Sequence, residues 1–352
     1  KSVEQVKEAP MITTKPMPLP PPPPQKKVVR EPVRHRKVTE KLPLQLAGGT
    51  AWVNADIYHP SSPAAPKTIV LIAPASGNAS RLGEVSGDGV NSYANSRNMS
   101  EEWAKSLANQ GFFVVSYDKR TCQHSENPIC GNVDQQDIDQ MGIKALSADI
   151  DQACQFAVSK VRSFFEPIRL VLMSATQGAQ AIALATCAGN ASGIVLLSPI
   201  IGDLETMWVE GLNRAAEHAK SLYEKNQLLN RKESMVDFFT SLKAQKFPEH
   251  GHTRGASVKF WQTWLDASVN TLALLTKINK PTMFLISTKD DFNDTALLKS
   301  IGQKTSEKSN IRIKYYTDTD RNFITENAIP EKALLDVKTF IHHLPPMPES
   351  AY

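Results

Sequence analysis

From about residue 42 to residue 346, short apolar runs alternate with longer segments of helical periodicity. The apolar runs are rich in β-branched residues and predict buried strands at 68–72, 112–117, 168–173, 193–197, 282–286 and 311–316. Between several of them, apolar positions recur every three or four residues, which predicts helices at 143–160, from Gln177 and from Pro330. This alternation has βαβ spacing. We therefore predict an α/β fold with a doubly wound, mainly parallel sheet.

Residues 201–280 interrupt this rhythm. Their pattern is helical throughout, and they contain Trp208, Trp261 and Trp264. Such a segment between two strands is typical of a helical cap inserted into the fold. We interpret the tryptophans as core residues of that cap rather than as a ligand-stacking set.

Residues 1–41 have almost no periodic apolar pattern. Proline occupies positions 16, 18 and 20–24, which favours an extended polyproline II rod because proline fixes φ and lacks the backbone donor of a helix. We predict a disordered, proline-rich tether at 1–41, a single domain at 42–346 and a short tail at 347–352. A ligand for a proline-binding module is the alternative interpretation of the proline run.

Charge follows the same boundary. The tether holds ten Lys or Arg residues against four Asp or Glu residues, while the whole chain has a net charge of +4. The remaining residues therefore carry about −2, which gives no electrostatic reason to expect a nucleic-acid partner. No apolar stretch reaches the length of a membrane span.

The first residue is Lys1 rather than Met, and one explanation is a removed leader. We expect an exported protein of the bacterial periplasm or cell envelope. A membrane tether through the removed N-terminus is possible on the same grounds.

The four cysteines give a second indication of export. Cys122 and Cys130 stand at the two ends of one polar segment, a placement that favours a disulfide and an oxidising compartment. Two unpaired thiols are the alternative, and we suspect a second bridge between Cys154 and Cys187. No cysteine lies in a metal-binding spacing, and we expect neither a metal nor another cofactor.

Several motifs resemble those of the α/β-hydrolase superfamily, in its esterase and dienelactone-hydrolase-like branch, over about residues 42–346. The segment 74–81, Pro-Ala-Ser-Gly-Asn-Ala-Ser-Arg, resembles the loop behind the third strand that supplies an oxyanion-hole amide. The segment 117–120, Tyr-Asp-Lys-Arg, resembles the turn after the next strand, with Thr121 in place of the usual glycine. The segment 260–266 resembles the return from the cap.

The nucleophile elbow of this superfamily is a strand-to-helix turn with a nucleophile between small residues. Here the corresponding turn reads Ser174-Ala175-Thr176-Gln177-Gly178, so threonine stands at the nucleophile position. A threonine hydroxyl can attack, but its extra methyl group restricts χ1. The resemblance implies oxyanion amides from Gln177 and from Ala75 or Ser76.

In this superfamily the nucleophile works with an acid and a histidine base, and of these two positions one is kept and one is replaced. By the same resemblance Asp290 is the triad acid, while Arg321 occupies the place of the histidine. Arginine cannot accept a proton near neutral pH because its pKa exceeds about 12. We therefore expect Asp290 and Arg321 to form an ion pair instead.

A histidine elsewhere could act as a relocated base. The histidines we considered are His124, after a strand, and three in the cap: His218, His250 and His252. We expect all four to be surface residues.

The sequence thus predicts a non-catalytic hydrolase relative that acts by binding, with an envelope protein or a small ligand under the cap as its partner. The alternative is an esterase or thioesterase with Thr176 as nucleophile and an unrecognised base. A third possibility is a scaffold whose pocket is filled.

Overall fold

The computed structural model describes residues 35–46, 49–63, 67–83, 98–122, 133–139, 141–161, 168–248, 250–290, 292, 310–317, 319, 321, 323–325 and 328–348. The chain divides into two units, Lys1–Pro32 and Val33–Tyr352. The first unit lies outside the described residues.

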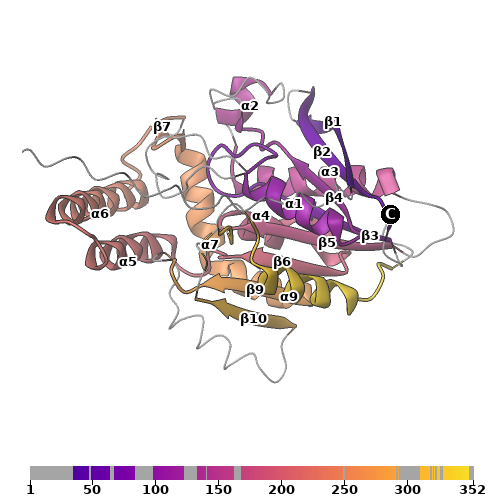
Figure 1. Cartoon of the computed structure of the whole chain (residues 1–352). Helices are drawn as coiled ribbons and strands as arrows, with labels where there is room; N and C mark the ends of the chain where they lie inside the picture. Colours follow the sequence, from indigo (N-terminus) through magenta and orange to yellow (C-terminus); the bar gives the residue numbers. More distant parts are fainter. Residues whose placement is uncertain are drawn as a thin grey trace, which may run out of the picture. The chain divides into compact units, whose positions relative to one another are not determined.

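The described residues form an eight-stranded sheet in the order β1-β2-β4-β3-β5-β6-β9-β10 (Figure 1). Its strands are β1 (His35–Leu46), β2 (Gly49–Pro60), β3 (Lys67–Ile72), β4 (Phe113–Tyr117), β5 (Ile168–Ala175), β6 (Gly193–Leu197), β9 (Thr282–Ser287) and β10 (Ile311–Tyr316). All pairings from β4 to β10 are parallel, whereas β2 pairs antiparallel with both β1 and β4. This confirms the predicted α/β fold with a mainly parallel sheet.

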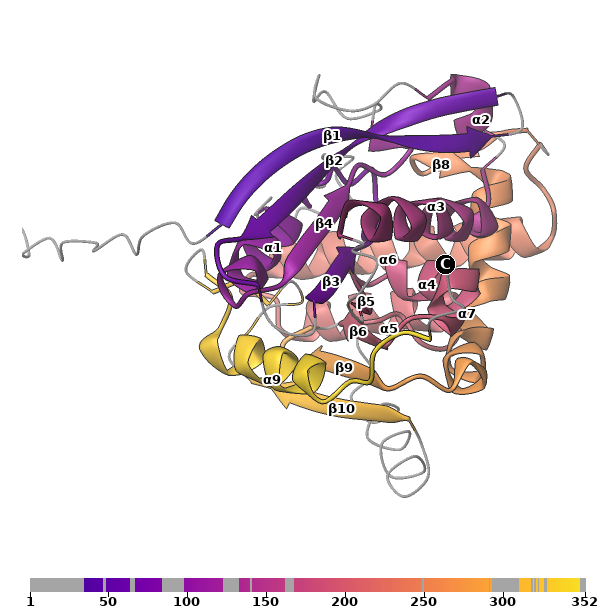
Figure 2. The same cartoon turned by 90° about the vertical axis from the view of Figure 1, so that its right-hand side faces the viewer.

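Helices cover both faces of this sheet (Figure 2). One face carries α1 (Met99–Asn109) and α9 (Glu331–His342), and the other carries α3 (Ile143–Val161) and α4 (Gly178–Leu184). Each layer has its own apolar core. Trp103 of α1 and Ile341 of α9 are fully buried in the first core, as are Ala153 and Ala157 of α3 in the second. The sheet is therefore doubly wound, as predicted.

The helical cap lies between β6 and β9. It contains α5 (Leu204–Glu217), α6 (Leu222–Lys243) and α7 (Val258–Ile278), with a small hairpin of β7 (His252–Thr253) and β8 (Ala256–Ser257). In Figure 1, α5 and α6 extend away from the sheet and α7 lies between them and the sheet. The N-caps are side chains of the kind that satisfy free helix donors: Asp203, Ser221 and Ser257 accept a backbone N–H three residues on.

Two of the three cap tryptophans pack as core residues, and the third, Trp208, is partly buried against the same core. Trp261 and Trp264 are buried with their rings 5.3 Å apart, and Trp261 also meets the ring of Phe238 at 5.1 Å. These contacts join α6 to α7 and bury apolar area that neither helix could bury alone.

Strand β1 begins before the predicted domain boundary. Residues 35–41, which we assigned to the tether, belong to β1 and pair with β2 from His35↔Pro60 onward. The strand lies at the edge of the sheet, where charged residues and proline are tolerated. Among residues 35–41 only Val38 is aliphatic, so this half of the strand shows no apolar pattern in the sequence. Only Leu42 and Leu44 are fully buried. The folded unit therefore starts near residue 33, not residue 42.

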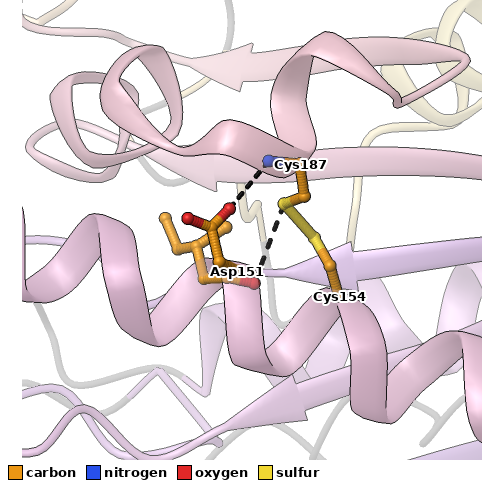
Figure 3. The surroundings of a disulfide bond; sticks show 4 residues. Asp151, Cys154 and Cys187 are labelled. Atoms are coloured by element: carbon orange, nitrogen blue, oxygen red, sulfur yellow. Dashed lines mark hydrogen bonds between the residues drawn. A yellow bond between two sulfur atoms is a disulfide. The ribbon is translucent and has the colours of Figure 1, made fainter. Parts of the chain in front are cut away.

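A disulfide joins Cys154 of α3 to Cys187 in a 3-10 turn at Thr186–Gly189 (Figure 3). The Cys187 backbone N–H also donates to Asp151 Oδ1 at 2.7 Å, so the turn is held to α3 twice. This confirms the suspected second bridge. Cys122 is also a disulfide-bonded residue, but its expected partner Cys130 lies outside the described residues, so that pairing stays a prediction.

None of the helices that the structure describes is long and apolar enough to cross a membrane.

Candidate active site

The turn from β5 into α4 has the backbone of a nucleophile elbow. Thr176 has φ 49°, a left-handed conformation that is costly for a β-branched residue and is found mainly where surrounding structure enforces it. Its backbone N–H donates to Leu197 O of the neighbouring strand at 3.0 Å. At Gly178 an added Cβ would lie 1.7 Å from Ser174 Oγ, so only glycine lets α4 start this close to β5. The elbow therefore keeps its backbone shape with threonine instead of serine at the nucleophile position.

Ser174 fits into the elbow by making a hydrogen bond. Serine stands here at the first small position of the motif, where glycine would take up less space. The Ser174 hydroxyl is buried and donates to Ala73 O at 2.8 Å. This bond ties the elbow to the loop after β3.

The hydroxyl of Thr176 faces Ser76 in that loop. The Ser76 backbone N–H donates to Thr176 Oγ1 at 3.2 Å, and the two hydroxyl oxygens are 2.7 Å apart. The backbone N–H of Gln177 donates to Ser76 Oγ at 3.2 Å. The Ser76 amide therefore points at the Thr176 hydroxyl, and the Gln177 amide points at the Ser76 hydroxyl, which lies where an oxyanion bound by Gln177 would lie. Ala75 contributes its carbonyl instead of its amide.

That carbonyl is bound by Lys119, a residue for which no role is predicted from the sequence. Lys119 Nζ donates to Gly77 O at 2.8 Å, to Gln177 Oε1 at 2.7 Å and to Ala75 O at 3.3 Å. The side chain is buried, and this burial lowers the pKa of its ammonium to about 7, an effect that the charge of Asp149 opposes. Lys119 thus connects the loop after β3 with the residue that follows Thr176.

A small cavity of about 10 Å³ lies beside Lys119 and is also lined by Gln177, Tyr117 and Asp149. This volume holds about one water molecule. The space next to the lysine is therefore too small for an organic ligand.

The charged residues around Lys119 have structural partners. Arg120 forms a buried ion pair with Asp149 of α3, with Nε 2.8 Å from Oδ2. Arg81 donates to Asp118 and, through Nε at 2.9 Å, to Asp56 of β2. The turn that resembles the superfamily's Tyr-Asp-Lys-Arg motif therefore anchors the loops around the elbow rather than supplying a reacting group.

The structure brings the predicted acid and base positions together. Arg321 Nη2 lies 3.5 Å from Asp290 Oδ1, and the side chain of Asp290 is 2% exposed. The guanidinium of Arg321 lies over the ring of Phe292, with 5.0 Å from Cζ to the ring centroid. Phe292 in turn meets Trp208 of the cap helix α5 edge to face, with centroids 5.1 Å apart. The arginine is thus held between a carboxylate and a ring that leads into the cap.

No histidine contacts the Thr176 hydroxyl among the residues that the structure describes; its hydrogen bonds go to Ser76. His252 pairs instead with Asp139 of α2 (Gln135–Asp139), with Nε2 2.9 Å from Oδ1. His218 ends α5, and His250 is exposed. His124 lies outside the described residues. Within the described residues, no group of His, Cys, Asp and Glu side chains is arranged to hold a metal ion.

The sheet order, the elbow and the cap between β6 and β9 define the class of protein as an α/β hydrolase. Residues 89–320 match the family model described as serine aminopeptidase, S33. The chain belongs to this family of α/β hydrolases. No curated protein matches the sequence significantly.

Solved structures of hydrolases share the fold at low sequence identity. One is the carboxyl esterase from Bacillus coagulans, with TM-score 0.55 and 14% identity over 86% of this chain and 98% of that one. Another is the proline iminopeptidase from Mycobacterium smegmatis, with TM-score 0.55 and 10% identity over 86% of this chain and 98% of that one. At these identities the likeness shows the fold alone.

Proposed function

We propose that this protein is a non-catalytic member of its hydrolase family that acts by binding an envelope protein or a small ligand under the cap. The ion pair between Arg321 and Asp290 is the observation that carries the proposal. A neutral hydroxyl attacks poorly until a neighbouring group takes its proton. Arginine cannot take it, and Asp290 already faces the positive charge of Arg321.

The proposed location is outside the cytoplasm, in the bacterial periplasm or cell envelope. The bridge between Cys154 and Cys187 supports this, because disulfides persist mainly in oxidising compartments.

An esterase or thioesterase with Thr176 as nucleophile is the second candidate. Membership of a hydrolase family favours this candidate over the first. The left-handed elbow at Thr176, with the amides of Ser76 and Gln177 beside it, is the structural observation in its favour. It requires a base other than Arg321.

Labelling by a fluorophosphonate probe separates the two candidates. The wild-type protein is compared with Thr176→Ala, and turnover of an aryl ester is measured in parallel. Equal absence of labelling and turnover in both proteins is the expected result. Thr176-dependent labelling together with turnover by the wild type would establish the second candidate.

A further inference from the structure

We infer that the Ser76 hydroxyl is a built-in occupant of the oxyanion site, and that Lys119 is the positioning residue that holds it there. The inference concerns the same site as the proposed function and rests on it, but it adds a second obstacle that is independent of the missing base. Without the Ser76 hydroxyl, the site should accept a tetrahedral group that places an oxygen beside the Gln177 amide.

The Ser76 side chain lies between the Gln177 amide and the Thr176 hydroxyl. An oxyanion hole works because preorganised donors point at the place where negative charge develops on a substrate oxygen. Here the Gln177 amide donates to Ser76 Oγ at 3.2 Å. The same oxygen is 2.7 Å from Thr176 Oγ1. A substrate oxygen between amide and nucleophile would have to take the position that the Ser76 hydroxyl fills.

Hydrogen bonds from Lys119 keep the loop that contains Ser76 in this position. The Lys119 ammonium donates to carbonyls on both sides of Ser76, those of Ala75 and Gly77, and to the side chain of Gln177. Hydrogen bonds from a charged donor are about twice as strong as neutral ones. Gly77 has φ 76°, so the loop turns sharply just after Ser76. Lys119 therefore holds Ser76 from both neighbours.

A direct chemical role for Lys119 is excluded by its surroundings. Its side chain is buried, its three hydrogen bonds go to oxygen acceptors, and its ammonium lies 5.7 Å from the centroid of the Phe260 ring. The adjoining cavity has room for about one water molecule. Lys119 therefore acts through Ser76 and Gln177.

The number of hydrogen bonds that Lys119 can donate to the Ser76 loop and to Gln177 depends on whether its amine is protonated. A protonated lysine has three donors, whereas the neutral amine has two. The pKa of about 7 makes this change occur near neutral pH. The groups that face Lys119 are Asp149, which is paired with Arg120, and the phenol of Tyr117, which stays neutral because burial raises its pKa well above its usual value.

Phenylboronic acid is the probe for the test. Its boron accepts the Thr176 oxygen to form a tetrahedral boronate, the hydroxyl proton leaves to solvent, and a boron-bound oxygen takes the oxyanion position. Equilibrium binding is measured by ¹¹B NMR for the wild type and for Ser76→Ala, with Ser159→Ala on the exposed side of α3 as the matched control. Ser76→Ala should bind about tenfold more tightly or better, the equivalent of one freed hydrogen bond. Adding Thr176→Val should abolish that gain.

The role of Lys119 has its own readout. The ratio of the two affinities, Ser76→Ala over wild type, should fall as the pH rises through about 7, because the wild-type loop loosens when Lys119 loses its proton. Taking the ratio cancels the ionisation of the boronic acid itself. Lys119→Met should bind the probe more tightly than the wild type and lose this pH dependence, while Lys105→Met on α1 should behave as the wild type.

Wild-type affinity equal to that of Ser76→Ala would overturn the inference, and a ratio that stays constant with pH would remove Lys119 from it. The pH dependence of the affinity ratio between Ser76→Ala and the wild type is measured without any Lys119 variant. This test therefore remains valid even if Lys119→Met does not fold. Tight boronate binding by the wild type without ester turnover would refute this inference alone. Thr176-dependent ester turnover by the wild type would refute the proposed function, and this inference would survive it only if Ser76→Ala still bound the boronate about tenfold more tightly than the wild type.

Discussion

Arg321 Nη2 lies 3.5 Å from Asp290 Oδ1, so a fixed positive charge stands where the superfamily has its proton acceptor. The carboxylate that would otherwise orient a histidine instead neutralises a guanidinium. If Asp290 and Arg321 occupy the acid and base positions, as we propose, the carboxylate faces a fixed positive charge and the residue at the base position cannot accept a proton.

Rebuilding the triad tests this assignment. The double variant Thr176→Ser with Arg321→His should gain weak hydrolysis of aryl esters, because it restores nucleophile and base beside Asp290. Thr176→Ser alone should gain almost nothing, since a positioned base contributes about 10²-fold or more. Adding Ser76→Ala to the double variant should raise the rate further by about tenfold. Initial rates with Thr176→Ala as background provide the measurement.

Two outcomes would count against the assignment. Robust turnover by the wild type that disappears in Thr176→Ala would show that another base operates. A gain as large in Thr176→Ser as in the double variant would show that the missing histidine is not what limits the reaction.

Much of this fold could be predicted from the sequence, because short apolar runs and the elbow motif are local signals. Gly178 of the elbow is one example. A Cβ added there would collide with Ser174, and the need for glycine is visible in the sequence as the last small residue of the motif. The edge strand β1 could not be predicted in the same way. Its charged residues are those of a solvent-facing edge, and only its pairing with β2 shows that it is a strand.

The pairing of Asp290 with Arg321 could be predicted from their order after the last strands, whereas the contacts of Ser76 and Lys119 could not. The Ser76 hydroxyl and the Lys119 ammonium acquire their roles through contacts with residues 100 and 58 positions away along the chain, respectively. A serine in a small-residue loop and a lysine in a turn have no periodic or spacing signal. The lysine's lowered pKa is likewise a consequence of tertiary burial.

The pH dependence of stability should report on Lys119. Its folded-state pKa of about 7 lies below the value of about 10.4 for an unfolded lysine, so the unfolded state binds more protons between these values. The destabilisation from burying the charge is therefore complete below pH 7, and stability rises as the pH increases above 7. From pH 7 to 9 this contribution is on the order of 2 kcal/mol.

Urea unfolding of the wild type and of Lys119→Met at each pH measures this contribution. The free-energy difference between the two proteins, wild type minus variant, should increase from pH 7 to 9. A difference that is flat over this range would mean that Lys119 keeps its proton in the folded state.

Removing the bridge between Cys154 and Cys187 should destabilise the protein. The bridge spans a sequence separation of 33 residues, for which the chain-entropy model gives about 3 to 4 kcal/mol. The variant Cys154→Ala with Cys187→Ala should therefore unfold at markedly lower urea concentration than the wild type under oxidising conditions. In the presence of a reductant that opens the bridge, the two proteins should converge.

The pairing of Cys122 with Cys130 is a separate prediction. Peptide mapping without reduction should recover one cross-linked peptide that contains both residues. The short loop between them makes the expected stabilisation about 2 to 3 kcal/mol. Detection of free thiol at Cys122 or Cys130 in the oxidised protein would contradict the pairing.

Truncation should locate the start of the folded unit. A chain that begins at Val33 should melt within a few degrees of the full-length protein. A chain that begins at Leu42 loses seven residues of β1, together with the hydrogen bond from the Thr39 hydroxyl to Asp56 at 2.6 Å. Its melting temperature should fall clearly below that of the longer chain. Equal melting of the two truncated proteins would restore residue 42 as the boundary.

The pairing of β1 also determines how the sheet would respond to mechanical tension. β1 pairs with β2 from His35↔Pro60 to Leu46↔Gly49, whereas β2 pairs with β4 only from Ala55 to Tyr58. Tension that arrives through the proline-rich segment enters the strand at its open end, beside His35. The hydrogen bonds of the hairpin would then open one after another, like a zipper, and the edge strand would yield before the strands that carry Thr176, Asp290 and Arg321. Under such a load the first strand would detach while the elbow and the cap stay in place.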